Sequence, residues 1–163
     1  MGEQGTPMPP VLDDEAAALA VFQKDVGEWD AELEVTPYPG ADVSRTAGRA
    51  TNRLIGGRWL VSDLTTESGF AGHGVYGWDP AQGAYVGLWV DAMSGGIAQG
   101  TGSWDEASRT MTYDFEVELQ DQMVRYREVT QVLQDGTQAY RNLRTMPDGS
   151  EHEVIRATYR RRS

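Results

Sequence analysis

Apolar and polar residues alternate along most of this chain with a period of two. Between Thr110 and Leu119, the odd-numbered residues are Met, Tyr, Phe, Val and Leu, and the even-numbered ones are Thr, Asp or Glu. This period is typical of a β-strand that turns one face to a core and the other to solvent. Similar segments recur along the chain and together predict about ten strands. The expected strands are 29–35, 46–55, 59–66, 72–78, 85–91, 97–104, 110–119, 124–133, 138–145 and 153–160.

Short segments rich in turn residues separate the expected strands. Gly56-Gly57, Asp79-Pro80 and Pro147-Asp148-Gly149 are turn signals, and Asp135-Gly136 between alternating segments is a strong hairpin signal. Short antiparallel strands at regular spacing form a sandwich or a barrel, and a closed barrel has no exposed edges. The sequence therefore predicts a mainly β fold, an antiparallel barrel of about ten strands with one N-terminal helix.

The N-terminal region follows a different pattern. Between Leu12 and Val26 the apolar residues spread over one broad helical face, and Asp13 or Asp14 can cap the first turn. Gly27 follows as the expected C-cap, which predicts a helix of about three turns. Residues 1–11 are rich in proline and glycine and are expected to form a disordered tail, and residues 12–163 are expected to form a single domain.

Composition and charge narrow the classes of function. The chain has 163 residues, no cysteine, and 25 acidic against 14 basic residues, for a net charge of −11. Binding to nucleic acid or to an anionic membrane relies on clusters of Lys and Arg, so neither is expected. The longest apolar run, 16–22, is far shorter than the ~20 residues of a membrane span, and residues 1–10 do not resemble a secretory signal. These features predict a cytoplasmic protein, and the strong preference for Arg over Lys indicates a bacterial source.

Three segments in a fixed order resemble a bacterial family of unknown function. They are Val26–Trp29, Ile55–Val61, and the stretch that runs from Tyr76–Pro80 to Tyr85–Met93. On these segments the chain is similar to domain-of-unknown-function family 1579 over most of its length. The resemblance implies a calycin-like barrel, related in shape to lipocalins and fatty-acid-binding proteins, and it implies no settled activity.

The calycin resemblance also implies a contact that closes one end of the barrel. In such barrels a Gly-x-Trp opens the first strand, as Gly27 and Trp29 do in this sequence. An arginine of the last strand often stacks over that tryptophan. The resemblance therefore places Arg156 or Arg160 over the Trp29 ring, as a cation–π contact within about 6 Å.

The first functional hypothesis is binding of a small, largely apolar molecule inside the barrel, because barrels of this size enclose a cavity for one ligand. Fatty-acid-type barrels hold a carboxylate with buried Arg and Tyr, and this resemblance implies an anionic head group at Tyr126 with Arg125 or Arg141. The alternative for these arginines is a ladder of salt bridges on a solvated face. The expected ligand-binding residues are Trp59, His73, Tyr85, Trp89, Tyr113, Arg125, Tyr126 and Arg141.

The strand at 85–91 supports two alternative functions. Asp91 ends it on the same face as Tyr85 and Trp89, and a carboxyl beside aromatic rings in a dry cavity has a raised pKa. Asp91 is thus a candidate catalytic acid or base of an isomerase, cyclase or hydrolase with Tyr or Arg partners. Its alternative role is to bond loop N–H groups near Met93. Because both faces of this strand are apolar, one is expected to line the interior, and the helix or a second subunit is expected to cover the other. A second subunit there would give a non-catalytic homodimer that serves as an interaction protein.

Metal and cofactor chemistry finds little support in the sequence. The two histidines, His73 and His152, belong to no metal-binding motif, so no metal site is expected. A carboxylate-rich metal site using Asp63 or Asp91 is the alternative. No cofactor is expected either, and the alternative is haem with His73 or His152 as axial ligand, because some calycin-like barrels bind haem through a histidine.

Overall fold

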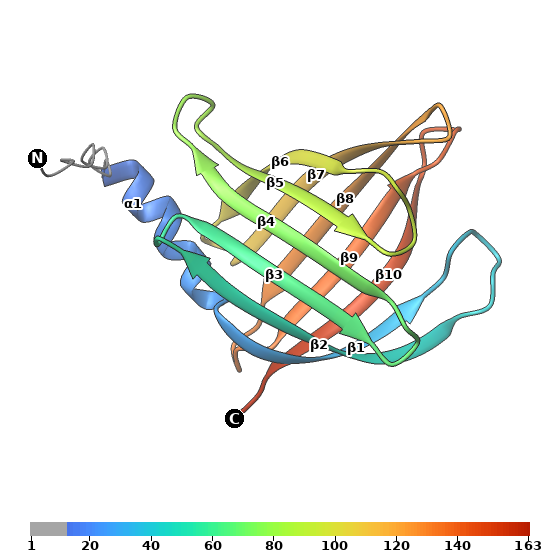
Figure 1. Cartoon of the computed structure of the whole chain (residues 1–163), viewed down its shortest axis with the longest axis horizontal. Helices are drawn as coiled ribbons and strands as arrows, with labels where there is room; N and C mark the ends of the chain where they lie inside the picture. Colours follow the sequence, from blue (N-terminus) through green and yellow to red (C-terminus); the bar gives the residue numbers. More distant parts are fainter. Residues whose placement is uncertain (1–12) are drawn as a thin grey trace, which may run out of the picture.

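The computed structural model describes residues 13–163, and the expected disordered tail at 1–11 lies outside the described residues. Within them the chain begins with helix α1 (Asp13–Ala20) and the 3₁₀ turn η1 (Val21–Lys24), and it continues as ten strands (Figure 1). No helix in this part of the chain is long and apolar enough to cross a membrane. The strands are β1 (Gly27–Val35), β2 (Ser44–Ile55), β3 (Trp59–Thr66), β4 (Ala71–Asp79), β5 (Ala84–Asp91), β6 (Ala98–Asp105), β7 (Thr110–Leu119), β8 (Gln122–Val132), β9 (Gln138–Thr145) and β10 (Glu151–Arg161).

The strands form one closed antiparallel barrel. Each strand pairs with its neighbours in sequence, and β1 closes the barrel by pairing with β10. Figure 1 shows the sheet curling from β1 round to β10, with α1 beside one end of the strands. The predicted mainly β fold, its antiparallel barrel and its N-terminal helix are confirmed.

The N-terminal helix is shorter than the sequence predicts. α1 ends at Ala20, η1 carries the chain to Lys24, and Gly27 is the first residue of β1 rather than a helix C-cap. The φ of Gly27 is 126°, and a Cβ at this position would lie 2.7 Å from Nη1 of Arg161. The 3₁₀ turn places the ring of Phe22 inside the barrel end, where it is 1% exposed. Burial of this ring offsets the poorer hydrogen bonds of the turn.

The side chains of each strand alternate between the barrel interior and the outer surface. On β7, Met111, Tyr113, Phe115 and Val117 are buried, as the alternation in the sequence predicts. The acids between them lie on the outer surface, where two of them form ion pairs with arginines of β8. The same alternation decides which residues of the other strands can reach the interior.

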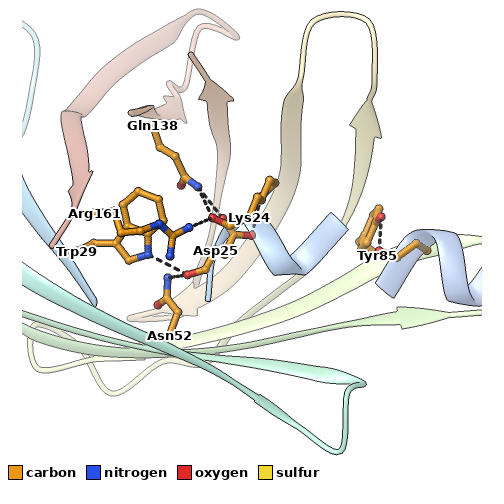
Figure 2. Close-up of polar contacts among 8 residues, drawn as sticks. Lys24, Asp25, Trp29, Asn52, Tyr85, Gln138 and Arg161 are labelled. Carbon is orange, nitrogen blue, oxygen red and sulfur yellow. Dashed lines mark hydrogen bonds and ion pairs between the residues drawn. The ribbon is translucent and has the colours of Figure 1, made fainter. Parts of the chain in front are cut away.

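We call the end of the barrel that is covered by α1 and η1 the closed end (Figure 2). The backbone carbonyl of Asp25 accepts hydrogen bonds from Nε1 of Trp29 and Nδ2 of Asn52, both at 2.9 Å. Its Oδ1 accepts a further bond from Nε2 of Gln138, also at 2.9 Å. The hydroxyl of Tyr85 donates to the carbonyl of residue 18 in α1 at 2.8 Å. These bonds tie the helical segment to β1, β2, β5 and β9.

The arginine that stacks over Trp29 is Arg161, whose guanidinium carbon lies 4.3 Å from the ring centroid. The expected kind of contact is present, but Arg156 and Arg160 are the wrong residues. Arg161 lies directly opposite Trp29 in the β1–β10 register and shares its face, whereas Arg160 lies opposite Asp30. Arg156 and Arg160 both form ion pairs on the outer surface instead.

Candidate functional site

The barrel encloses a cavity of about 610 Å³, which we call the main cavity. It extends away from the closed end to the opposite end of the barrel, the open end, where Ser68, Met93 and Ser94 line its rim. Its wall is mostly apolar and comes from strands all around the barrel. The apolar lining includes Leu33, Leu64, Phe70, Trp89, Val117, Val124 and Ile155.

Glycines on β4 make room for the aromatic rings of this wall. A Cβ at Gly72 would lie 2.1 Å from Cζ2 of Trp89, and a Cβ at Gly74 would lie 2.6 Å from Cε2 of Tyr76. Larger residues at these positions would displace the rings, because a strand glycine marks a close approach of neighbouring groups. The two glycines therefore help to set the shape of the main cavity.

Three side chains form the floor of the main cavity: Tyr76 of β4, Glu128 of β8 and Tyr140 of β9. The same three side chains also line a smaller cavity of about 130 Å³ on the side of the closed end, which we call the inner cavity. Trp29 and Asn52 belong to its lining, so the inner cavity lies against the hydrogen bonds of the closed end. The floor therefore separates a larger apolar space from a smaller, more polar one.

Glu128 is the acidic group of the floor. The hydroxyl of Tyr140 donates to Oε1 of Glu128 at 2.9 Å, and Nδ2 of Asn142 donates to the Tyr140 hydroxyl at 3.5 Å. Burial raises the pKa of Glu128 to about 7, and the hydrogen bond from Tyr140 opposes part of this rise. Near neutral pH the carboxyl can therefore both give and accept a proton.

Tyrosines from several strands surround Glu128. Burial raises the pKa of Tyr76, Tyr126, Tyr140 and Tyr159, and the negative charge of Glu128 is the next cause for each of them. Their hydroxyls therefore stay protonated at physiological pH and can donate hydrogen bonds.

Asp91 also lines the main cavity, at the end of β5. Its Oδ2 accepts a hydrogen bond from Nε1 of Trp89, and its Oδ1 accepts one from the backbone N–H of Met93, both at 2.9 Å. These contacts agree with the alternative role, in which Asp91 fixes the loop that follows its strand. A catalytic role for Asp91 stays a prediction.

The two arginines of the expected anion site lie on the outer surface. Nε of Arg125 is 2.9 Å from Oε1 of Glu116, and Nε of Arg141 is 2.6 Å from Oε2 of Glu153. Tyr126 faces the main cavity instead, because neighbouring residues of a strand point to opposite faces. The hypothesis of an anionic head group at Tyr126 with Arg125 or Arg141 is therefore wrong, and both arginines form the salt bridges of a solvated face.

Trp59 and His73 also lie on the outer surface, outside the expected binding site. Trp59 is 42% exposed, and Nδ1 of His73 is 2.6 Å from Oδ1 of Asp63. The other histidine, His152, contacts the carbonyl oxygen of Thr36 through Nε2 at 2.7 Å. Neither histidine is among the described residues that line the two cavities, so this barrel does not fit haem with a histidine ligand. Among residues 13–163, no group of three or more His, Cys, Asp or Glu could hold a metal ion.

The remaining expected site residues face the interior. Trp89 and Tyr126 line the main cavity, and Tyr113 lines the inner cavity. Tyr85 packs in the core at the closed end, where its ring centroid lies 5.4 Å from that of Phe22. Contact of these residues with a ligand stays a prediction, and the hydroxyl of Tyr85 is already used in the bond to α1.

Reasoning from the sequence missed the floor of the main cavity. The signal that could have found Glu128 is the alternation of Val124, Tyr126 and Glu128 on one face of β8, since the first two are apolar or aromatic. Tyr140 and Asn142 share one face of the next strand in the same way. In the sequence, Glu128 lies among exposed arginines and therefore looks like part of a solvated face. Only the pairing of β8 with β9 shows that it meets the inward-facing residues of β9.

Comparison with solved structures supports the barrel fold. The chain is similar to the crystal structure of Rv2717c from M. tuberculosis, with a TM-score of 0.68 and 11% identity over 90% of this chain and 98% of that one. A redesigned β-barrel, b11L5F_LGL, matches with a TM-score of only 0.36 and 15% identity over 91% of this chain and 96% of that one. At 11% identity the first likeness shows the fold alone. A search of the curated proteins finds no match.

The sequence also matches a protein family directly. The match covers residues 15–161 and therefore includes most of α1, the barrel strands and the floor of the main cavity. The family is described as "Protein of unknown function (DUF1579)". The chain belongs to the DUF1579 family.

Proposed function

We propose that this protein binds one small, largely apolar molecule in the main cavity. The observation that carries the proposal is a cavity of about 610 Å³ with an apolar wall and a polar floor. Small-molecule sites typically have volumes of roughly 300–1,000 Å³, apolar walls and a few convergent polar groups. Glu128, Tyr140 and Asn142 supply such groups.

The arrangement of the cavity indicates how a ligand would lie. Its apolar body would pack against side chains such as Leu64 and Val117, where each Å² of buried apolar surface contributes roughly 25 cal/mol. Its polar atom would reach the floor and bond there. An anionic group is not part of the proposal, because Asp91 and Glu128 line the cavity and would repel it.

A neutral apolar dye, N-phenylnaphthylamine, tests the proposal because its fluorescence rises in an apolar site. Val124 and Val129 lie on the same strand, and only Val124 faces the main cavity. Val129 pairs with outward-facing residues of β7 and β9. We expect the native protein to bind the dye saturably. Val124→Trp should fill part of the cavity and weaken binding at least about tenfold, whereas Val129→Trp should leave it unchanged.

The control measurements separate loss of the cavity from loss of the fold. Circular dichroism and thermal unfolding should show that both tryptophan variants are folded. Equal dye binding by the two folded variants would contradict the proposal, because the dye would then lie outside the main cavity. Lack of saturable binding by the native protein would contradict it as well.

A further inference from the structure

The charged groups inside the main cavity are acidic. Glu128 lies at the floor, and Asp91 lies at the end of β5. Among the described residues that line this cavity, Arg45 alone carries a cationic side chain, but that side chain is 73% exposed and its Nε donates to Oε1 of Glu34 at 3.1 Å. The main cavity therefore offers Glu128 no cationic partner from the described part of the chain.

The inner cavity does not supply such a partner either. Lys24 lines it, but Nζ of Lys24 lies 2.5 Å from Oδ2 of Asp25 and 5.3 Å from the centroid of the Trp104 ring. These contacts already hold the ammonium group at the closed end. A buried carboxylate without a counter-charge is unfavourable, so a cation supplied by a ligand would stabilise the ionised form of Glu128.

Aromatic rings surround the same carboxyl. Tyr76, Tyr126 and Tyr140, here called the cage tyrosines, line the main cavity together with Glu128. The charge of Glu128 raises the pKa of each of them, so their rings lie within its electrostatic reach. The faces of aromatic rings attract cations, and sets of such rings recognise organic ammonium groups.

We propose that the ligand of the main cavity is a lipophilic amine, bound as its ammonium ion at the carboxyl of Glu128 among the cage tyrosines. This proposal rests on the proposed function and specifies its ligand class. The apolar body of the amine would extend along the wall toward the open end. The net charge of −11 favours the approach of a cation over that of an anion.

Two other ligand classes fit the cavity less well. A neutral alcohol can form a hydrogen bond at the floor, but it leaves an ionised Glu128 without a counter-charge. A carboxylate ligand places a second negative charge beside Glu128 and Asp91. Affinity should therefore follow the order amine, alcohol, carboxylate for ligands that share one alkyl chain.

Proton release distinguishes an ammonium ligand from the other classes. Below about pH 6 the carboxyl of Glu128 is mostly protonated, so a bound ammonium ion should drive the loss of that proton to solvent. At about pH 8 the carboxyl is mostly ionised and little proton release should occur. An alkylamine resembles lysine, with a pKa of ~10.4, and stays charged throughout this range.

The titratable groups around Glu128 are tyrosines of several strands and one acid. They are Tyr76 of β4, Tyr113 of β7, Tyr126 of β8, Tyr140 of β9 and Tyr159 of β10, with Asp91 beside Tyr126.

Isothermal titration calorimetry of the native protein with decylammonium, decanol and decanoate tests this order directly. We expect decylammonium to bind at least about tenfold more tightly than decanol at about pH 8, and decanoate to bind most weakly. Affinity for decylammonium should rise between about pH 6 and about pH 8, because the competing proton is lost. Titrations in two buffers with different ionisation enthalpies should show proton release at the lower pH.

Glu128→Gln removes the charge and keeps the shape of the side chain. It should lower the affinity for decylammonium to nearly that of the native protein for decanol. Glu116→Gln is the matched control, because Glu116 also bonds to a side chain of the neighbouring strand, Arg125, but lies on the outer surface. It should leave binding of both probes unchanged.

The outcomes separate this inference from the proposed function. If decanol binds as tightly as decylammonium and no proton is released, the amine class is overturned while binding of an apolar molecule stands. If none of the three probes binds, the amine class is overturned, and the dye titration decides whether the proposed function stands. The comparison of probes and buffers uses the native protein, so the test holds even if Glu128→Gln does not fold.

Discussion

Burial gives the Glu128 carboxyl a higher pKa in the folded barrel than in the unfolded chain. Its pKa is about 7 in the barrel, against 4.5 for an unperturbed glutamate. The folded protein holds this proton more tightly, so the contribution of Glu128 to the free energy of unfolding falls as pH rises from about 4.5 to about 7 and is constant above that range. The fall is about 1–3 kcal/mol, because one pKa unit is worth ~1.4 kcal/mol and Glu128 is only half-buried, since it lines both cavities.

Glu128→Gln should therefore abolish the part of the pH dependence of the unfolding free energy that comes from this carboxyl. Urea unfolding at about pH 5 and about pH 8 should show the native protein losing about 1–3 kcal/mol across the interval and the variant losing much less. Glu116→Gln should behave like the native protein, since its carboxyl lies on the outer surface in an ion pair. If Glu128→Gln lost as much unfolding free energy as the native protein between these two pH values, another group would be the cause of the pH dependence.

Exposed turn carboxylates act in a different pH window. Hydrogen bonds from Gln82 and Ser108 lower the pKa of Asp79 and Asp105, respectively. A lowered pKa contributes stability that is present above the unfolded pKa and is lost as pH falls through the folded pKa, below about 4. Their titration therefore does not overlap with that of Glu128 between about pH 5 and about pH 8.

At the scale of elements, the closed end is held together by contacts between Arg161 of β10 and the segment around the end of η1. Both terminal nitrogens of the Arg161 guanidinium donate to backbone carbonyls, Nη1 to Val26 and Nη2 to Lys24, and the group stacks over Trp29. The Lys24 carbonyl ends the 3₁₀ turn and the Val26 carbonyl follows it, so neither accepts a hydrogen bond from a continuing helix. Arg161 therefore joins the last strand to the segment that enters the first.

Arg161→Ala should lower the free energy of unfolding by about 1–3 kcal/mol, because it removes a cation–π contact and leaves two carbonyls without these donors. The matched control is Arg160→Ala, the next residue on the same strand. Nη1 of Arg160 lies 3.6 Å from Oε2 of Glu32 in an exposed pair, so this change should stay within about 0.5 kcal/mol. Urea unfolding measures the free energy of unfolding of both variants. Equal decreases in the two would contradict the role given to Arg161.

The elements themselves could be predicted well from the sequence. Each expected strand overlaps a strand of the barrel, because alternation such as that of 110–119 is set by burial of one sheet face. The end of α1 could not be predicted, because it depends on the space that the barrel end leaves for Phe22. The choice of Arg161 over Arg156 or Arg160 required the register between β1 and β10.

At the scale of the whole molecule, closure of the barrel creates the candidate site. Tyr76 of β4 and Glu128 of β8 share a floor because the sheet curls round until these strands contribute to one cavity. Alternation within a strand indicates which residues point inward, but it does not indicate which inward residues of distant strands meet at one level. For that reason reasoning from the sequence named Tyr126 and Trp89 as ligand-binding residues yet did not identify the floor.

The outer surface carries an apolar band across β3, β4 and β5. Val61, Val75 and Leu88 lie side by side in register, and Val86 and Val90 flank Leu88 on the outer face of β5. The band, apart from the buried Val61, is half-buried in the single chain. This surface is where the homodimer expected from the two apolar faces of β5 would form.

We expect the native protein to sediment as a dimer at micromolar concentration, with this apolar band as the interface. Leu88→Glu should give a monomer, because pairing the bands would bury a charge without a partner. Gln131→Glu adds the same charge at an exposed position on the outer face of β8, far from the band in strand order, and should remain dimeric. Analytical ultracentrifugation decides the matter: a native monomer, or a dimer that survives Leu88→Glu, would show that the band is not an interface between copies of this chain.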